Sequence, residues 1–281
     1  MGEVLKELSV VMTVYNREPE VLLAVLRSLW RSVPQGTQLV IVDDGSTIDY
    51  AFARGYISNH FEDAIWHRID LYEAYRIAGG YNNPARAFNA AVDLARHERL
   101  IIMSSDVLAN PKVFARLHAY EPREAIYTPA VIDTESGMQY CGPQRVFPMP
   151  WLLGTSKSLT AEVGGWDELY LKGLCYEDND FIGRLALACG QIIGDWNNIV
   201  YHISHDQPAY VVTDHDVAAA NERNRKHTLA RWKGIPFDRD CSPFDVMRAM
   251  HPSGDIAYNC IDRNGILTKI IESVRAGKAT A

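Results

Sequence analysis

The chain lacks the features of disulfide-rich, zinc-binding or membrane-spanning proteins. It has five cysteines in 281 residues, an odd number, and no two of them form a CxxC pair. Neither a disulfide framework nor a cysteine zinc site is therefore expected. No apolar run approaches the ~18 residues of a membrane span, and the polar start, Met1 to Leu8, does not resemble a signal peptide. These observations predict a cytoplasmic protein.

The chain also lacks an excess of positive charge. Its 28 Lys and Arg residues are outnumbered by 35 Asp and Glu, which gives a formal net charge of -7. General binding to nucleic acid is therefore not expected. An acidic protein that binds an anionic diphosphate needs a local source of positive charge, such as a metal ion, a helix N-terminus or a few Arg and Lys side chains. The length and the 47% hydrophobic content suit one large α/β domain with a sizeable core.

One segment near the C-terminus has the composition of a membrane-surface helix. Gly265–Lys278 has apolar residues at helical spacing and carries three basic residues, Lys269, Arg275 and Lys278. Such a helix can also pack against the protein's own core. Any membrane association is therefore expected to be weak at most.

Three short apolar runs predict buried strands of a mostly parallel sheet. They are Ser9–Tyr15, Leu39–Val42 and Leu100–Met103, each continuous and rich in β-branched residues. Segments with helical periodicity lie between them, among them Glu20–Trp30 and Ala85–Ala95. This alternation predicts a Rossmann-like, doubly wound α/β domain with helices on both faces of the sheet.

Beyond about Ala130 the pattern changes, and the predicted elements are shorter. They are a hairpin and loop over Ile132–Pro150, a helix over Asp178–Cys189, two short strands at Gln191–Ile193 and Ile199–Ile203, and a polar helix over Asp214–Trp232.

Polar residues accompany the end of each apolar run. The carboxyl ends of parallel strands meet at one edge of a sheet, where ligands bind. A single Asp after a strand is usually a turn residue, but three coincident polar ends predict a binding crevice. These residues are Thr13 and Tyr15 in the first run, Asp43 and Asp44 after the second, and Ser104, Ser105 and Asp106 after the third.

No glycine-rich phosphate loop accompanies these strand ends. The sequence contains no GxGxxG after the first run and no GxxxxGK[ST] anywhere. A nucleotide bound at this edge must be held without a glycine cradle. A divalent ion such as Mn²⁺ or Mg²⁺, held by a carboxylate, is the expected substitute because it can bridge diphosphate oxygens.

Two pairs of motifs carry a family resemblance. Val10–Asn16 (VVMTVYN) and Val42–Thr47 (VDDGST) resemble the opening of family 2 glycosyltransferases of the GT-A fold. Gly164–Glu168 (GGWDE) and Gly173–Phe181 (GLCYEDNDF) resemble the acceptor-half motif of β-1,4-galactosyltransferases and chondroitin-polymerase-like enzymes. The second pair is the more specific because it combines two glycines, a tryptophan and two acidic clusters at fixed spacing.

This resemblance implies a single GT-A catalytic domain over residues 1–207, followed by a helical C-terminal extension or lid over 208–281. Residues 1–110 would form the nucleotide-sugar half and 111–207 the acceptor half. The implied activity is an inverting, metal-dependent glycosyltransferase (hexosyltransferase-like, EC 2.4). It would move a sugar from a nucleotide sugar, expected to be a UDP-sugar, to the hydroxyl of a glycan or other acceptor.

The resemblance also assigns residues to the donor and the metal ion. The donor would contact Thr13, Tyr15, Asp43, Asp44, Arg86 and Ser104, with Tyr15 stacking on the base and Asp43 orienting the loop. Ser104 takes the first acidic position of the DxD motif, and Asp106, at its last position, would be the metal ligand. A second ligand would be His202, with His205 as the second choice.

On the acceptor side, the resemblance assigns Asp178 as the general base and Glu177 as a hydrogen-bond partner of the acceptor. Clustered carboxylates raise each other's pKa, which favours a base. Trp166 and Asp167 would form the acceptor wall, Trp166 offering a flat face; the alternative is that Trp166 is a core residue. Asp180 would sit about one turn into the helix, where it could cap the N-terminus; the alternative is that the whole acidic cluster is such a cap.

Two other functions remain open from the sequence. A sugar nucleotidyltransferase has a similar sheet and ion, but normally a Gly-rich loop with Arg and Lys after its first strand, which Thr13–Arg17 does not supply. A degenerate protein that binds a nucleotide sugar without activity would explain Ser104. The adjacent Glu177 and Asp178 argue against it, because a pure binder needs no base.

Overall fold

The computed structural model describes eight stretches of the chain. They are 7–69, 83–117, 120–141, 149–173, 175–189, 191–204, 214–231 and 257–260. His205 and the predicted helix Gly265–Lys278 lie outside the described residues.

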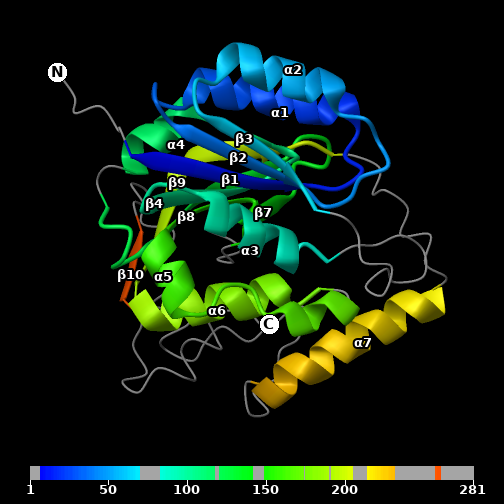
Figure 1. Ribbon diagram of the computed structural model, residues 1–281. Helices are drawn as coiled ribbons and strands as arrows, with labels where there is room; N and C mark the ends of the chain where they lie inside the picture. The colour runs from blue at the N-terminus through cyan, green and yellow to red at the C-terminus, as the bar shows by residue number, and fades with distance from the viewer. Residues whose placement is uncertain are drawn as a thin grey trace.

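A central mixed sheet organises the described residues (Figure 1). Its strand order is β10-β9-β6-β8-β4-β1-β2-β3, with β5 added beside β9 and β7 beside β6. The strands are β1 (Leu8–Val14), β2 (Gln38–Asp43), β3 (Ala64–Arg68), β4 (Arg99–Ser104), β5 (Val107–Leu108), β6 (Ile126–Asp133), β7 (Gln139–Cys141), β8 (Leu152–Ser156), β9 (Gln191–His202) and β10 (Ala257–Cys260). β1 to β4 pair in parallel, whereas β8 runs antiparallel to both β4 and β6.

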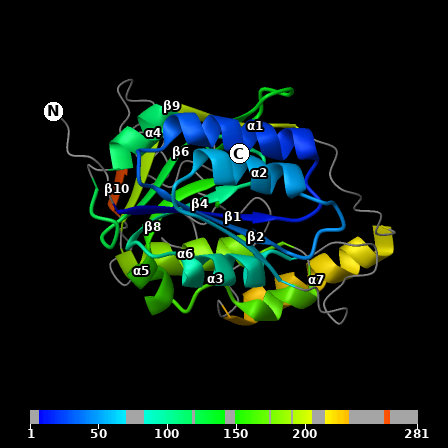
Figure 2. The same cartoon turned by 45° about the horizontal axis from the view of Figure 1, so that its top comes forward.

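Helices cover both faces of the sheet, as the sequence predicts. The helices are α1 (Pro19–Ser32), α2 (Ala51–His60), α3 (Ala85–Leu94), α4 (Pro111–Arg116), α5 (Lys157–Glu162), the 3₁₀ helix η3 (Glu168–Lys172), α6 (Glu177–Cys189) and α7 (Asp214–Arg231). In Figures 1 and 2, α1 and α2 lie over one face, and α3, α5 and α6 lie over the other. α7 lies at the outer side of α6 and η3.

The three apolar runs form β1, β2 and β4, which confirms the predicted strands to within one residue at each end. Their apolar side chains are almost completely buried because helices pack on both faces. α1 starts with Pro19 in its first turn, where the missing N–H costs nothing. α3 begins at Ala85, as predicted, and Asn83 accepts a hydrogen bond from its first N–H.

The predicted pair of short strands is one continuous strand, β9, and this expectation was wrong. The polar residues between the two apolar runs form a bulge: Pro129 pairs with Asp195, but Ala130 pairs with Ile199. Asp195 is fully buried there and accepts hydrogen bonds from the Tyr127 hydroxyl (2.9 Å) and the Asn198 amide (2.6 Å). Polar residues thus continue the strand because Oδ2 of Asp195 is satisfied by hydrogen bonds inside the bulge.

The C-terminal extension contains a strand as well as a helix. α7 confirms the polar helix predicted over Asp214–Trp232. Ala257–Cys260 forms β10, which pairs in parallel with β9 and extends the sheet, so the extension is not helical throughout. Among the residues that the structure describes, no helix is both long and apolar enough to cross a bilayer.

Candidate active site

The predicted donor residues meet at the carboxyl edge formed by β1, β2 and β4. Thr13 is in register with Val42 on one side and with Ser104 on the other. The loops after β1 and β2 are joined by hydrogen bonds: the Asn16 N–H donates to Ser46, and the Asn16 side chain accepts from the Thr47 N–H at 2.7 Å. Three segments distant in the sequence therefore form one polar edge.

Asp43 holds the loop that follows β2. Its side chain is buried and accepts from the Ser46 N–H at 2.8 Å, while Arg68 lies 3.5 Å from its other oxygen. Gly45 in this loop has a φ of 76°, in the left-handed region that favours glycine. Asp43 thus makes the kind of contact that the predicted orienting role requires.

The other predicted donor residues lie in the loop after β2, just beyond β1 and in α3. Asp44 is buried and its N–H donates to Val14 O, while Tyr15 is half-buried just beyond β1. Arg86 is half-buried in the first turn of α3. Their contacts with a nucleotide stay predictions.

Asp106 and His202 face each other across the β5–β9 pairing. His202 is in register with Val107, and its Nε2 lies 3.7 Å from Oδ2 of Asp106. The backbone supports this approach, because the Ile203 N–H donates to the Asp106 carbonyl at 2.7 Å. Ser104 donates to Oδ1 of Asp106 at 2.6 Å. The structure therefore brings together the two residues predicted to hold a metal ion.

A third residue, Asp133, orients His202. Its Oδ2 lies 3.0 Å from Nδ1 of His202. The N–H and hydroxyl of Ser136, together with His202 and Ser204, hold the pKa of Asp133 well below its usual range. A carboxylate on one imidazole nitrogen directs the other nitrogen toward the site, as carboxylates behind metal-binding histidines do. Nε2 of His202 therefore points toward Asp106.

Oxygen and imidazole donors of this kind suit Mn²⁺ or Mg²⁺ together with diphosphate oxygens. The described residues contain no group of three or more His, Cys, Asp and Glu side chains suited to a metal ion. Asp106 and His202 could hold an ion as two protein ligands, so a nucleotide diphosphate would have to complete the coordination.

The acidic motif begins α6 behind a strained turn. Cys175 and Tyr176 have φ values of 61° and 73°, in the left-handed region, and Glu177 follows as the first helical residue. Such conformations cost of order 1–3 kcal/mol each and are concentrated at functional sites. The strain fixes the direction in which the first turn presents its carboxylates.

Glu177 and Asp178 both have raised pKa values. Burial raises the pKa of Glu177, and the neighbouring charge of Asp178 raises it further. Burial also raises the pKa of Asp178, while a hydrogen bond from Trp166 opposes that shift. Of the two, Asp178 is the more exposed side chain. The pair therefore combines a carboxyl that holds its proton with a neighbour that ionises more readily.

Trp166 does not offer a flat face to an acceptor, and that prediction was wrong. The ring is 1% exposed, with Phe88 and Phe181 stacked on it at centroid distances of 4.7 and 3.6 Å. Trp166 is thus a core residue, the alternative that the sequence left open. Its polar contribution is the indole N–H, which donates to Asp178 at 3.3 Å.

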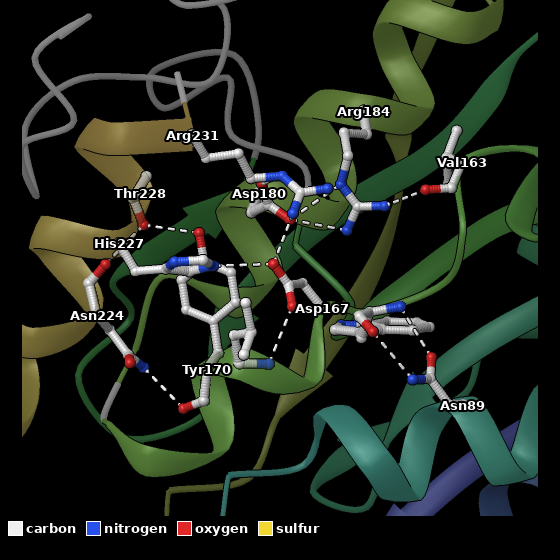
Figure 3. Close-up of polar contacts among 12 residues, drawn as sticks. Asn89, Val163, Asp167, Tyr170, Asp180, Arg184, Asn224, His227, Thr228 and Arg231 are labelled. Carbon is white, nitrogen blue, oxygen red and sulfur yellow. Dashed lines mark hydrogen bonds and ion pairs between the residues drawn. The ribbon is translucent and has the colours of Figure 1, made fainter. Parts of the chain in front are cut away.

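Asp167 and Asp180 are engaged by helix α7, as Figure 3 shows. Asp167 accepts from His227 at 2.9 Å and from Arg231 at 2.6 Å. Burial opposes ionisation of Asp167, but His227, the Leu169 N–H and Arg231 outweigh it and lower its pKa. Asp180 is fully buried and pairs with Arg184 and Arg231. Both oxygens of Asp180 therefore face guanidinium groups, and its capping role stays a prediction.

α7 also holds the strained turn before Glu177. The Asn224 amide donates to the carbonyls of Tyr170 (3.1 Å) and Cys175 (2.9 Å), and the Tyr170 hydroxyl lies 2.8 Å from the Thr228 hydroxyl. Asn224 and Thr228 are both buried (Figure 3). A helix with little apolar character is therefore fixed to the acidic motif by buried polar contacts.

Several solved structures have a similar arrangement of elements. The fold is similar to TarS from S. aureus (TM-score 0.58, 16% identity, covering 83% of this chain and 44% of that chain). It is also similar to residues 1–349 of TarS in complex with UDP-GlcNAc (TM-score 0.59, 14% identity, covering 98% of this chain and 93% of that chain). A third similar structure is the mannosyltransferase PcManGT from Pyrobaculum calidifontis in complex with GDP-Man and Mn²⁺ (TM-score 0.55, 15% identity, covering 98% of this chain and 76% of that chain). The chain thus spans less than half of the full TarS chain.

The fold is therefore the GT-A fold, a mixed α/β domain with a curled central sheet. Residues 9–136 match the family described as Glycosyl transferase family 2. No curated protein sequence matches the chain. The domain match covers β1 to β6 and hence the edge that carries Asp43, Asp44 and Asp106.

Three residues of the site were missed from the sequence. Arg17 contacts Asp106, Asp133 orients His202, and Asn224 holds the turn before Glu177. The partners lie 89, 69 and 49 positions apart, so no local spacing connects them. A signal did exist for Asp133: the stretch from Asp133 to Gly137 has the composition of a turn that follows a strand.

Proposed function

We propose that the chain is a metal-dependent glycosyltransferase that moves a sugar from a nucleotide sugar, a UDP-sugar in particular, to an acceptor hydroxyl. The observation that carries this proposal is the approach of His202 Nε2 to Asp106 Oδ2 at 3.7 Å, with Asp133 behind the imidazole. The site lies at the strand ends of the segment that matches family 2. The complexes of TarS with UDP-GlcNAc and of PcManGT with GDP-Man and Mn²⁺ support a nucleotide-sugar donor and a divalent ion.

Donor binding would depend on the edge of β1, β2 and β4. Thr13, Tyr15 and Asp44 would contact the nucleoside, with Arg86 and Ser104 nearby, while Asp43 keeps the loop in place. Asp106 and His202 would hold the ion, which supplies positive charge to the leaving diphosphate.

The acceptor would react through the acidic motif. Its oxygen attacks the anomeric carbon as the bond from that carbon to the diphosphate oxygen breaks, and the electron pair leaves with the diphosphate. Asp178 takes the acceptor proton. Its raised pKa brings it closer to the operating range of a general base. Glu177, whose pKa is raised further from its ordinary value, can donate its O–H to the acceptor. A single displacement of this kind inverts the configuration at the sugar.

The division of labour along the chain remains part of this proposal. Residues 1–110 would bind the donor and 111–207 the acceptor, with 208–281 as an extension that stabilises the acceptor side. Asp167 would contact the acceptor only by sharing its carboxylate with His227 and Arg231. The acceptor is a glycan or another hydroxyl compound, and the cytoplasmic location stays a prediction.

Thermal unfolding with a panel of nucleotide sugars tests the proposal. A ligand that binds the folded state at 100 times its Kd adds about 2.7 kcal/mol to the free energy of unfolding. We expect a UDP-sugar with Mn²⁺ to raise the Tm, Asp106→Asn to remove that rise, and Asp178→Asn to keep it. A protein stabilised by no nucleotide sugar, or equally well without metal, would contradict the proposal. A binder without activity would show the same Tm shifts but no release of diphosphate in any condition.

A further inference from the structure

Arg17 reaches the carboxylate proposed to bind the metal ion. Its Nη2 lies 2.8 Å from Oδ2 of Asp106, the oxygen that faces His202. The Arg17 carbonyl accepts from the hydroxyl of Tyr50 at 2.7 Å, and Tyr50 is fully buried. The Arg17 side chain is 12% exposed. Tyr50 therefore anchors the backbone of Arg17, and the mostly buried guanidinium belongs to the site through its contact with Asp106.

Two other nitrogens of this guanidinium have unused hydrogen-bond donors. Among the described residues, Nε and Nη1 of Arg17 are buried and have no hydrogen-bond partner. Nη1 lies 3.6 Å from Oε2 of Glu18, which is an ion-pair distance but too long for a hydrogen bond. Arginine carries five N–H donors in a rigid fork that suits phosphate oxygens. A buried cation with unused donors thus lies beside the proposed site of a diphosphate.

The carboxylate of Asp106 is already neutralised by these contacts. Ser104 donates to Oδ1 and Arg17 to Oδ2. Ser104 also leaves the motif with one carboxylate where the DxD pattern has two. A divalent ion bound at Oδ2 would share that oxygen with a guanidinium and be repelled by its charge. A diphosphate would relieve this conflict, because its oxygens can accept from Arg17 and ligate the ion.

We propose that Arg17 couples metal binding to nucleotide binding: it weakens the ion's hold on Asp106 alone and binds the diphosphate when both ligands are present. This inference rests on the proposed donor site. Metal and nucleotide then bind cooperatively, and the coupling is reciprocal, since each ligand raises the affinity for the other by the same factor.

Calorimetric titration with Mn²⁺ and UDP tests this proposal through binding rather than activity. In Arg17→Gln we expect Mn²⁺ alone to bind several-fold more tightly, because the competing charge is gone. UDP at saturating Mn²⁺ should bind about tenfold or more weakly, because charged hydrogen bonds to the diphosphate are lost. The two changes have opposite signs. Loss of a merely structural ion pair would weaken both or change neither.

Two further variants complete the test. Arg17→Lys keeps the charge but not the fork, so Mn²⁺ alone should bind as in the wild type and UDP more weakly. This variant preserves the test if the glutamine variant does not fold. Arg54→Gln, which removes an exposed arginine that pairs with Asp49, should match the wild type in both titrations.

The outcomes separate this inference from the proposed function. Wild-type protein that binds UDP and Mn²⁺, with Arg17 variants that show unchanged affinity and coupling, would overturn the role of Arg17 alone. Wild-type protein that binds neither ligand would overturn both.

Discussion

The indole N–H of Trp166 donates to Oδ1 of Asp178 at 3.3 Å, which connects the GGWDE motif directly to the acidic motif that follows it. The ring is stacked between Phe88 and Phe181, so the indole N–H is held in one orientation. Burial raises the pKa of Asp178, and this hydrogen bond opposes the shift. The aromatic residue of the motif therefore tunes the proposed base.

Trp166→Phe should move the acidic limb of the pH–rate profile to higher pH. Asp178 must be ionised to take a proton, so the rate rises with pH through its pKa. Without the indole donor that pKa rises, by up to about one unit. The measurement is kcat as a function of pH. The value of kcat on the plateau at high pH should stay close to the wild-type value, while the rise of kcat at low pH should shift. As a control, Phe88→Leu loosens the stack without removing the donor and should leave the limb in place. An unshifted limb in Trp166→Phe would show that the hydrogen bond does not act on the base.

Asp133→Asn should weaken metal binding although Asp133 is not a proposed ligand. The carboxylate on Nδ1 of His202 sets the direction of Nε2, and such partners typically contribute about 10–100-fold in metal affinity. Titration with Mn²⁺ in the presence of UDP measures the effect. Asp49→Asn, at an exposed position, serves as the matched control. Wild-type Mn²⁺ affinity in a folded Asp133→Asn protein would remove His202 from the proposed metal site.

Asn224→Ala should destabilise the protein and lower kcat through the turn before Glu177. The substitution removes the buried amide that donates to the carbonyls of Tyr170 and Cys175, at a cost of about 1–3 kcal/mol in the free energy of unfolding. Because the donor edge is elsewhere, UDP affinity should not change. A fall in UDP affinity with kcat unchanged would contradict the assignment of α7 to the acceptor side.

A double-mutant cycle with Gly173 checks that contact. A Cβ added at Gly173 would overlap the side chain of Asn224, so Gly173→Ala should destabilise the protein by about 1–3 kcal/mol. The same change in the Asn224→Ala background should cost less, since the obstructing amide is gone. Chemical denaturation of the four proteins measures the difference, and additive effects would show that the two residues do not meet.

The central sheet and much of the site were predictable from short-range patterns. The strands β1, β2 and β4 are continuous apolar runs that end in polar residues, and their pairing places Thr13 beside Ser104. β8 was missed because Leu152–Ser156 is short and mixes apolar, glycine and polar residues. β9 was divided because Asp195 and Asn198 read as the end of a strand, although they satisfy each other in a buried bulge.

The contacts that tune the site could not be predicted, because they join distant segments. Asp106 is a strand-end acid that sequence reasoning finds, but Arg17 comes to it from the loop after β1. Trp166 belongs to a motif that the sequence shows. The motif does not show that Phe88 and Phe181 stack on the ring and cover its two faces. Only the folded chain shows that the ring is buried and that its N–H reaches Asp178.

Release of nucleoside diphosphate from a UDP-sugar in the presence of Mn²⁺ and an acceptor tests the central claim most directly. The wild type should release UDP and form a glycosylated product, with both reactions abolished by Asp106→Asn. Asp178→Asn should lower kcat by about 10²–10⁴, because an amide cannot take the acceptor proton, while UDP affinity stays near wild type. Glu177→Gln should chiefly raise the KM for the acceptor. Full kcat in a folded Asp178→Asn protein, or product formation by Asp106→Asn at the wild-type rate, would contradict the mechanism.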